Sequence, residues 1–134
     1  MKYNGIIEKK LRVMEENISD IQSWEISLYQ HLKENSMLQK ATERSLQISI
    51  EVMIDISERI LALNNVQPGN TASENMKKLE DLGVIKSADN YSDMVRFRNF
   101  IVHRYEKIDL EILYSIVRNK LHLFRQFSDE IRSA

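Results

Sequence analysis

Residues that interrupt helices are scarce in this chain of 134 residues, which contains one proline and three glycines. A sheet of many strands needs frequent tight turns, and glycine and proline are the residues that most such turns require. Their scarcity therefore favours long helices joined by a few loops. The clearest turn signal is Pro68-Gly69, inside the polar segment 64–70. We expect an all-α protein.

The apolar residues repeat with the period of a helix. In the segment 6–32 they recur in steps of three and four, with Glu25 as the one polar exception, which places them on one face. The apolar members of this face are Ile7, Leu11, Met14, Ile18, Ile21, Leu28 and Leu32. We predict that the segment is one helix. A second helix, apolar on more than one face, is expected over about residues 36–64 and should lie centrally.

Capping residues predict three further helices. Thr71 begins a capping-box pattern for the third helix, and Gly83 lies where that helix should end. Ser87 or Asp89 is expected to cap the fourth helix, and Asp109 the last one. At this length a single domain is expected. The prediction is therefore one domain, residues 1–134, folded as a five-helix up-down bundle.

Charge and composition exclude several classes of function. The formal net charge is -1, so RNA binding would need a local positive patch or a cleft between two copies. The chain has no cysteine, which excludes disulfides and thiolate metal sites and fits the reducing cytoplasm where we expect the protein. No apolar run approaches the roughly 20 residues of a transmembrane helix, so no association with a membrane is expected.

The chemistry of the sequence is concentrated in the eight residues from Arg98 to Tyr105, Arg-Asn-Phe-Ile-Val-His-Arg-Tyr. Arg98 is a permanent cation suited to phosphate, and His103 has a side chain whose reference pKa is about 6.5. A cation near a group that exchanges protons at neutral pH is what acid–base cleavage of a phosphodiester needs. Neutral His103 suits proton abstraction, Arg98 suits charge stabilisation, and Asn99 can orient the phosphate or the imidazole.

The spacing from Arg98 through His103 to Tyr105 closely resembles the R-x4-H-x-Y motif of HEPN-domain ribonucleases, and more narrowly the HepT-like toxins of toxin–antitoxin pairs. The usual polar residue after the arginine is present as an asparagine. Segments 43–51 and 75–85 resemble the second and third helices of the family, so the likeness covers nearly the whole chain. It implies a HEPN-type bundle, a two-fold homodimer and a metal-independent endoribonuclease without a cofactor.

The resemblance also implies a partner and a mode of inhibition. In the family, an antitoxin that is a minimal nucleotidyltransferase can modify the motif tyrosine with AMP, which places the modification on Tyr105 here. A bulky nucleotide with negative phosphates would exclude RNA by occupancy and by charge. Tyr105 is otherwise expected to support the site, because a phenol is neutral near pH 7 and is a poor base.

The helical spacing of the motif favours a dimer. Residues 98 and 103 lie about 140° apart on an ideal helix. Arg98 and His103 therefore do not share one small pocket unless the helix distorts or the site is an open cleft. Two copies of the fourth helix facing each other would form a composite groove. Arg96, Arg104 and Lys107 would add positive charge that attracts the RNA backbone to it.

Two other functions remain open on the same residues. One is a non-catalytic module whose groove holds a nucleotide or docks a nucleotidyltransferase, and the other is a purely structural helical dimer. Arginines such as Arg98 are commonly surface ion-pair partners, and His103 would also suit a helix end for its interaction with the dipole. His31 and His122 lack the spacing of metal ligands with each other or with His103, so no metal site is predicted.

Overall fold

The structure is a computed structural model that describes the backbone of residues 5–102 and 109–134, and the side chains of these residues except 99–102. Within these ranges it contains seven α-helices, one 3-10 helix and no strand, so the predicted all-α class is confirmed. The helices are α1 (Gly5–Ser23), α2 (Tyr29–Lys33), α3 (Ser36–Leu63), α4 (Ala72–Asp81), η1 (Ala88–Tyr91), α5 (Ser92–Val102), α6 (Leu110–Asn119) and α7 (Leu121–Ser133).

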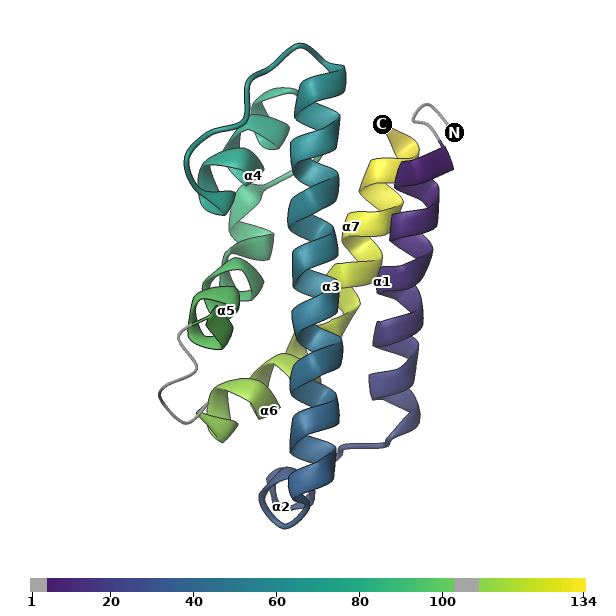
Figure 1. Ribbon diagram of the computed structural model, residues 1–134, viewed down its shortest axis with the longest axis vertical. Coiled ribbons are helices and arrows are strands. Elements are labelled where there is room, and N and C mark those ends of the chain that lie inside the picture. The colour runs from purple at the N-terminus through teal and green to yellow at the C-terminus, as the bar shows by residue number, and fades with distance from the viewer. Residues whose placement is uncertain (1–4, 103–108) are drawn as a thin grey trace.

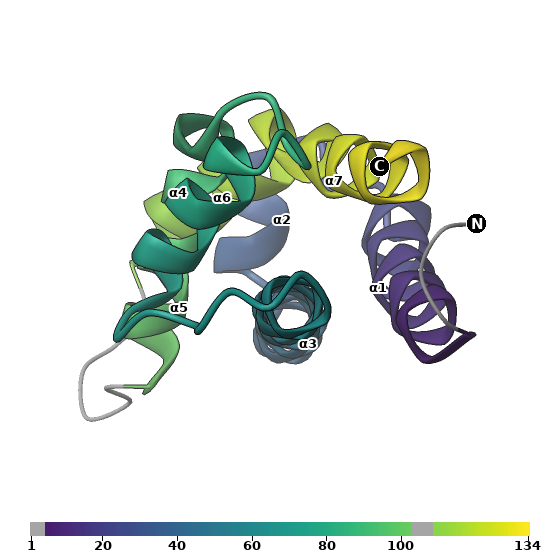
Figure 2. The ribbon, with the colours of Figure 1, turned by 90° about the horizontal axis from the view of Figure 1, so that it is seen from above.

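Helix α3 is the central element, as predicted. It runs along most of the molecule, with α1 and α7 on one side and α4 and α5 on the other (Figure 1). Seen from above, the other helices form an arc around α3 and leave one side of it uncovered (Figure 2). The exposed charged residues of α3 include Arg44, Glu51 and Arg59. None of the described helices is long and apolar enough to cross a membrane.

The predicted apolar face of the first helix is confirmed over α1. Its five members from Ile7 to Ile21 are buried, and α1 packs along α3. Burying an aliphatic side chain of this size contributes roughly 1.5–3 kcal/mol. On its other flank α1 meets α7. There the Arg132 guanidinium binds the carboxylates of Glu8 and Glu15, with Nη2–Oε1 distances of 2.9 and 2.5 Å.

The predicted single helix over residues 6–32 is wrong beyond Ser23, where α1 ends and the short helix α2 follows after a connection. Glu25 adopts φ 51°, the left-handed conformation that normally ends a helix at a glycine. Its N–H donates to the Gln22 carbonyl at 3.2 Å. Because a glutamate occupies this position, the sequence carries no termination signal there. Leu28, expected in the core, is 58% exposed.

The predicted last helix is divided at Lys120 into α6 and α7. Lys120 has φ −123° and ψ −7°, which departs from helical geometry. Helix α6 packs against α2, whereas α7 packs against α1. The bend therefore allows the two halves to bury their apolar faces against different helices. The predicted cap is confirmed, because the Asp109 carboxylate accepts a hydrogen bond from the Glu111 N–H at 2.9 Å.

Both predicted ends of α4 are confirmed. The Thr71 Oγ1 accepts a hydrogen bond from the Glu74 N–H at 3.1 Å, and Gly83 adopts φ 76° just beyond the helix. The capping box differs in one detail, since the Glu74 carboxylate accepts from the Asn70 N–H at 2.9 Å. The loop before α4 is therefore tied to its first turn.

Helix α5, which carries the start of the motif, is fixed at its N-terminal end by η1. Tyr91 is buried, and its ring lies edge-on to Phe127 of α7 with centroids 5.3 Å apart. The Tyr91 hydroxyl donates a hydrogen bond to the Glu130 carboxylate, which also accepts from the Lys86 N–H at 2.6 Å. These contacts hold the beginning of α5 against α7.

Candidate functional site

Arg98 is the motif residue whose side chain the structure places. Met94 and Phe97 of α5 are buried, so one face of this helix packs in the core. Arg98 follows Phe97 and is half-buried. Its Nε atom is buried and has no hydrogen-bond partner among the described residues. An unsatisfied buried donor costs about 1–3 kcal/mol, more for a charged group, so this guanidinium is a candidate for ligand binding.

Arg98 lines a cavity of about 290 Å³ between α3, α4 and α5. Ile54 and Glu58 contribute the α3 wall. The opposite wall is formed by residues 69–73, which are the loop before α4 and its first turn, and by Asn75. The cavity therefore combines a cation, a carboxylate, an amide side chain and a helix N-terminus.

The rest of the predicted motif is not placed by the structure. The backbone of Asn99 belongs to α5, but its side chain is not described. Outside the described residues lie four predicted site residues: His103, Arg104, Tyr105 and Lys107. Their roles therefore stay predictions. Of the predicted site residues, side-chain positions are available for Arg96 and Arg98.

Arg96 and Arg98 do not converge. Two residues apart on a helix, they point about 160° away from each other. Arg96 is 71% exposed and lies 4.0 Å from the Asp93 carboxylate. It lines a separate cavity of about 370 Å³ between α5 and α6. Exposed ion pairs of this kind contribute about 0–1 kcal/mol, so Arg96 can exchange its partner for a phosphate at little cost.

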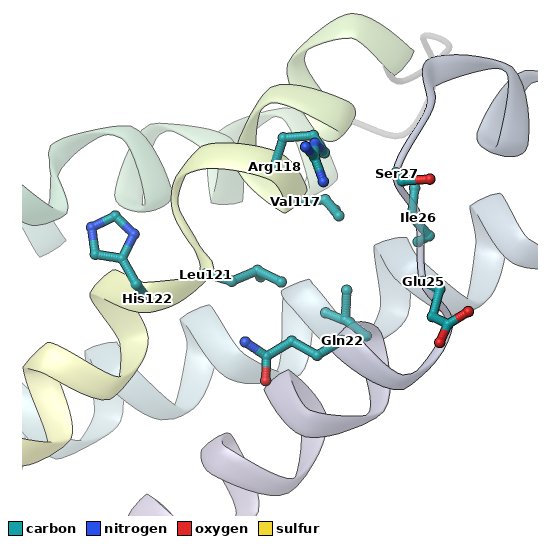
Figure 3. A pocket seen from close by; sticks show the side chains of 9 residues that line it. Gln22, Glu25, Ile26, Ser27, Val117, Arg118, Leu121 and His122 are labelled. Atoms are coloured by element: carbon teal, nitrogen blue, oxygen red, sulfur yellow. The ribbon is translucent and has the colours of Figure 1, made fainter.

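A third cavity, of about 330 Å³, lies between the end of α1 and the junction of α6 and α7. Figure 3 shows Arg118 and His122 on the α6–α7 side and Gln22 and Glu25 on the α1 side. None of its lining residues belongs to the Arg98 cavity. The sequence holds no local motif for this cavity, because its walls come from segments at opposite ends of the chain.

The two carboxylates with lowered pKa values, Glu8 and Asp55, hold helices together. Hydrogen bonding from Arg132 lowers the pKa of Glu8, despite the opposing effect of burial. Burial alone would raise the pKa of Asp55, but hydrogen bonds from Lys10 and Arg59 outweigh it and lower that pKa. These carboxylates join α1 to α7 and to α3, and none of them lines the cavity beside Arg98.

Comparisons with known proteins agree with the motif. Residues 14–131 match the family model described as Ribonuclease HepT-like. A relative, the mRNA nuclease HepT of Shewanella oneidensis, is 28% identical over 135 residues, which cover 97% of this chain and 98% of that protein.

Solved structures share the fold over nearly the full length. A tri-AMPylated Shewanella oneidensis HEPN toxin in complex with MNT antitoxin is similar at a TM-score of 0.88 and 28% identity, covering 98% of this chain and 100% of that one. The cytosolic protein of unknown function YutE from Bacillus subtilis reaches a TM-score of 0.81 at 21% identity, covering 95% and 86%. This second likeness concerns the fold alone.

Proposed function

The chain belongs to the ribonuclease HepT-like family, and on that basis we propose that it is a metal-independent endoribonuclease that acts as the toxin of a toxin–antitoxin pair. The family match over residues 14–131 includes the whole motif from Arg98 to Tyr105. The relatives' names give a nuclease for mRNA and a toxin paired with an antitoxin. The observation that carries the proposal is Arg98, whose buried Nε has no described partner and which lines a cavity.

In the proposed reaction the 2′-hydroxyl of the RNA attacks the adjacent phosphorus, and the bond to the 5′-oxygen breaks. His103 takes the proton of the 2′-hydroxyl as a general base, or returns one to the leaving oxygen as a general acid. Arg98 stabilises the negative charge of the phosphorane by charge-assisted hydrogen bonds. Asn99 orients the phosphate or the imidazole.

A homodimer completes this proposed site. Residues 98 and 103 lie about 140° apart on an ideal helix, so a single copy does not aim both side chains at one phosphate. Two copies related by a two-fold axis, with their α5 helices facing each other, would let Arg98 of one copy approach His103 of the other. Such a composite groove would be doubly positive and wide enough for a nucleic-acid strand, with Arg96, Arg104 and Lys107 along the path of the RNA backbone.

The proposed partner is a minimal nucleotidyltransferase antitoxin. The similar HEPN toxin is tri-AMPylated and bound to an MNT antitoxin. We assign the equivalent modification in this chain to Tyr105. Each added AMP brings a phosphodiester charge into the groove, which repels the RNA backbone and occupies its space.

The decisive experiment compares RNA cleavage by the wild type with that by His103→Ala, in the presence of a chelator and without antitoxin. General acid–base catalysis contributes roughly 10²–10⁴-fold, so His103→Ala should be slower by at least the lower of these factors. His122→Ala is the matched control, because His122 is exposed on α7 and lines a different cavity. Equal rates for wild type and His103→Ala would refute the assignment of His103.

Expression in cells separates the nuclease from a non-catalytic binding module. The proposed toxin should arrest growth when it is expressed alone, and co-expression of the antitoxin should restore growth. A binding module would leave growth unchanged in both cases. A chain that neither arrests growth nor binds nucleotide would be a structural dimer.

A further inference from the structure

We propose that the cavity beside Arg98 binds one nucleotide, with the phosphate held by Asn75, Arg98 and the first turn of α4 and a ribose hydroxyl held by Glu58. The inference rests on the proposed function, because it assigns a subsite to the strand that the enzyme would cleave. The motif alone places the site on α5 and the residues after it. The proposed subsite also includes residues of α3 and α4. In Figure 1, α4 lies beside α3 and next to α5.

The hydrogen bonding of the Asn75 side chain is the first evidence for a ligand in this cavity. The residue is 2% exposed, and its Oδ1 accepts a hydrogen bond from the Gly69 N–H at 2.7 Å. This bond fixes which end of the amide faces the loop. The Nδ2 donates to no residue that the structure describes, and Asn75 lines the cavity. This amide hydrogen-bond donor is open to solvent rather than sealed in the core, so it can donate to a group bound in the cavity.

Arg98 provides a second donor on another helix. Its Nε is buried and unpaired among the described residues, and its side chain lines the same cavity. The Asn75 amide on α4 and the Arg98 guanidinium on α5 thus border one space. A phosphate has enough acceptor oxygens to satisfy both at once, and guanidinium–phosphate hydrogen bonds are among the strong ones.

The first turn of α4 adds backbone donors. The earliest backbone hydrogen bond of this helix joins the Asn75 N–H to the Thr71 carbonyl at 3.2 Å. The Glu74 N–H is capped by the Thr71 hydroxyl. The amides of Ala72 and Ser73 precede these bonds, and both residues line the cavity. Free amides at a helix N-terminus, together with the helix dipole, favour an anion.

Glu58 makes the cavity more selective than a simple anion site. It lies across from α4 on α3 and lines the same space, so it would repel an isolated phosphate. A ligand with both a hydroxyl and a phosphate would fit the cavity. Its hydroxyl would donate a hydrogen bond to Glu58, and its phosphate would accept hydrogen bonds from the opposite wall. A nucleotide has both groups, and about 290 Å³ is near the lower limit of roughly 300 Å³ for small-molecule sites. Since DNA lacks the 2′-hydroxyl, Glu58 would favour RNA.

The test measures binding of short single-stranded RNA, DNA of the same sequence and 5′-AMP to the full chain carrying His103→Ala, which should slow cleavage during the measurement. Ser73→Asp places a carboxylate at the cavity wall, at an exposed position where the helix dipole favours an acid, so folding should be retained. We expect RNA affinity to fall about tenfold or more. Ser36→Asp is the control. It makes the same change in the first turn of α3, about 30 Å along that helix from Glu58.

Two further variants separate the parts of the site. Asn75→Asp keeps the oxygen that accepts from Gly69 and removes the unpaired donor, so RNA binding should weaken as for Ser73→Asp. Glu58→Gln should reduce the preference for RNA over DNA. If Ser73→Asp folds and binds RNA as tightly as Ser36→Asp, the inference is wrong. If only 5′-AMP binding is lost, the cavity serves a free or attached nucleotide and the substrate-strand assignment is overturned.

Cleavage by the chain with His103 intact is followed in parallel, so the two proposals can fail separately. If that enzyme cleaves RNA and the cavity variants bind RNA normally, the subsite is refuted and the proposed function stands. If RNA binding depends on Ser73 and Asn75 but no cleavage occurs, the subsite stands and the nuclease assignment fails.

Discussion

Glu25→Gly should stabilise the protein, because Glu25 holds a backbone conformation that glutamate disfavours. Its φ is 51°, and the left-handed region costs a residue with a Cβ roughly 1–2 kcal/mol. Glycine avoids this cost but loses about 0.5–1 kcal/mol more conformational entropy on folding. The Glu25 side chain is exposed and makes no hydrogen bond or ion pair with the described residues, so its removal sacrifices no contact there.

The net expected gain is about 0.5–1 kcal/mol in the free energy of unfolding. For a chain of this size that corresponds to a rise in Tm of roughly 2–5 °C. Urea unfolding followed by circular dichroism measures the free energy, and thermal melting measures Tm. Both should be recorded at one protein concentration, because dimerisation would make Tm depend on concentration.

Two other helix ends supply matched controls. Asn65 has φ 59°, but asparagine tolerates this region, so Asn65→Gly should gain less than Glu25→Gly. Gly83 has φ 76° and open space where a Cβ atom would lie, so Gly83→Ala should destabilise through backbone strain alone. An unchanged or lower stability of Glu25→Gly, with Gly83→Ala destabilised as expected, would refute the reasoning at Glu25.

Four more outcomes are expected. Arg98→Lys should reduce RNA cleavage at least about tenfold with little change in Tm, because lysine lacks the planar fork and the Arg98 Nε holds no described partner; equal cleavage would contradict the phosphate role. The lowered pKa of Glu8 contributes stability that is present above its ordinary value of 4.5 and is lost as pH falls through the folded value. Arg132→Gln should therefore lower the free energy of unfolding at neutral pH. It should also reduce the loss of that free energy as the pH falls, which urea unfolding at several pH values would show. Light scattering should give a mass twice the 15.8 kDa of one chain; a monomer would contradict the composite groove. Tyr105→Phe should abolish labelling by AMP from the antitoxin, whereas Tyr114→Phe should not.

Signals local in sequence predicted the helix ends that they mark. Thr71 and Asp109 cap α4 and α6, and Gly83 ends α4, because each residue acts through its own side chain or its own φ. The face of α1 was predictable for the same reason, since helical periodicity alone determines which side chains share a side. The motif identified the family, and its arginine, Arg98, lines a cavity in the structure.

Features that depend on packing were not predictable. The end of α1 relies on a glutamate in a conformation typical of glycine, and the bend at Lys120 exists because α6 and α7 pack on different helices. The cavity beside Arg98 also depends on packing and could not be predicted from the sequence. Asn75 and Glu58 have no distinctive spacing from Arg98 in the sequence, and only the packing of α3, α4 and α5 brings them together.

The ion pairs of Arg132 with Glu8 and Glu15 connect residues that are far apart in the order of synthesis. As the protein emerges from the ribosome, α1 and α3 can meet early, but α1 lacks its second neighbour until residue 132 has been translated. The flank of α1 that faces α7 therefore stays uncovered throughout most of elongation, whereas its apolar face can already pack on α3. Co-translational folding would close the bundle late, and an incomplete translation product that stops before Arg132 would leave Glu8 and Glu15 without their cation.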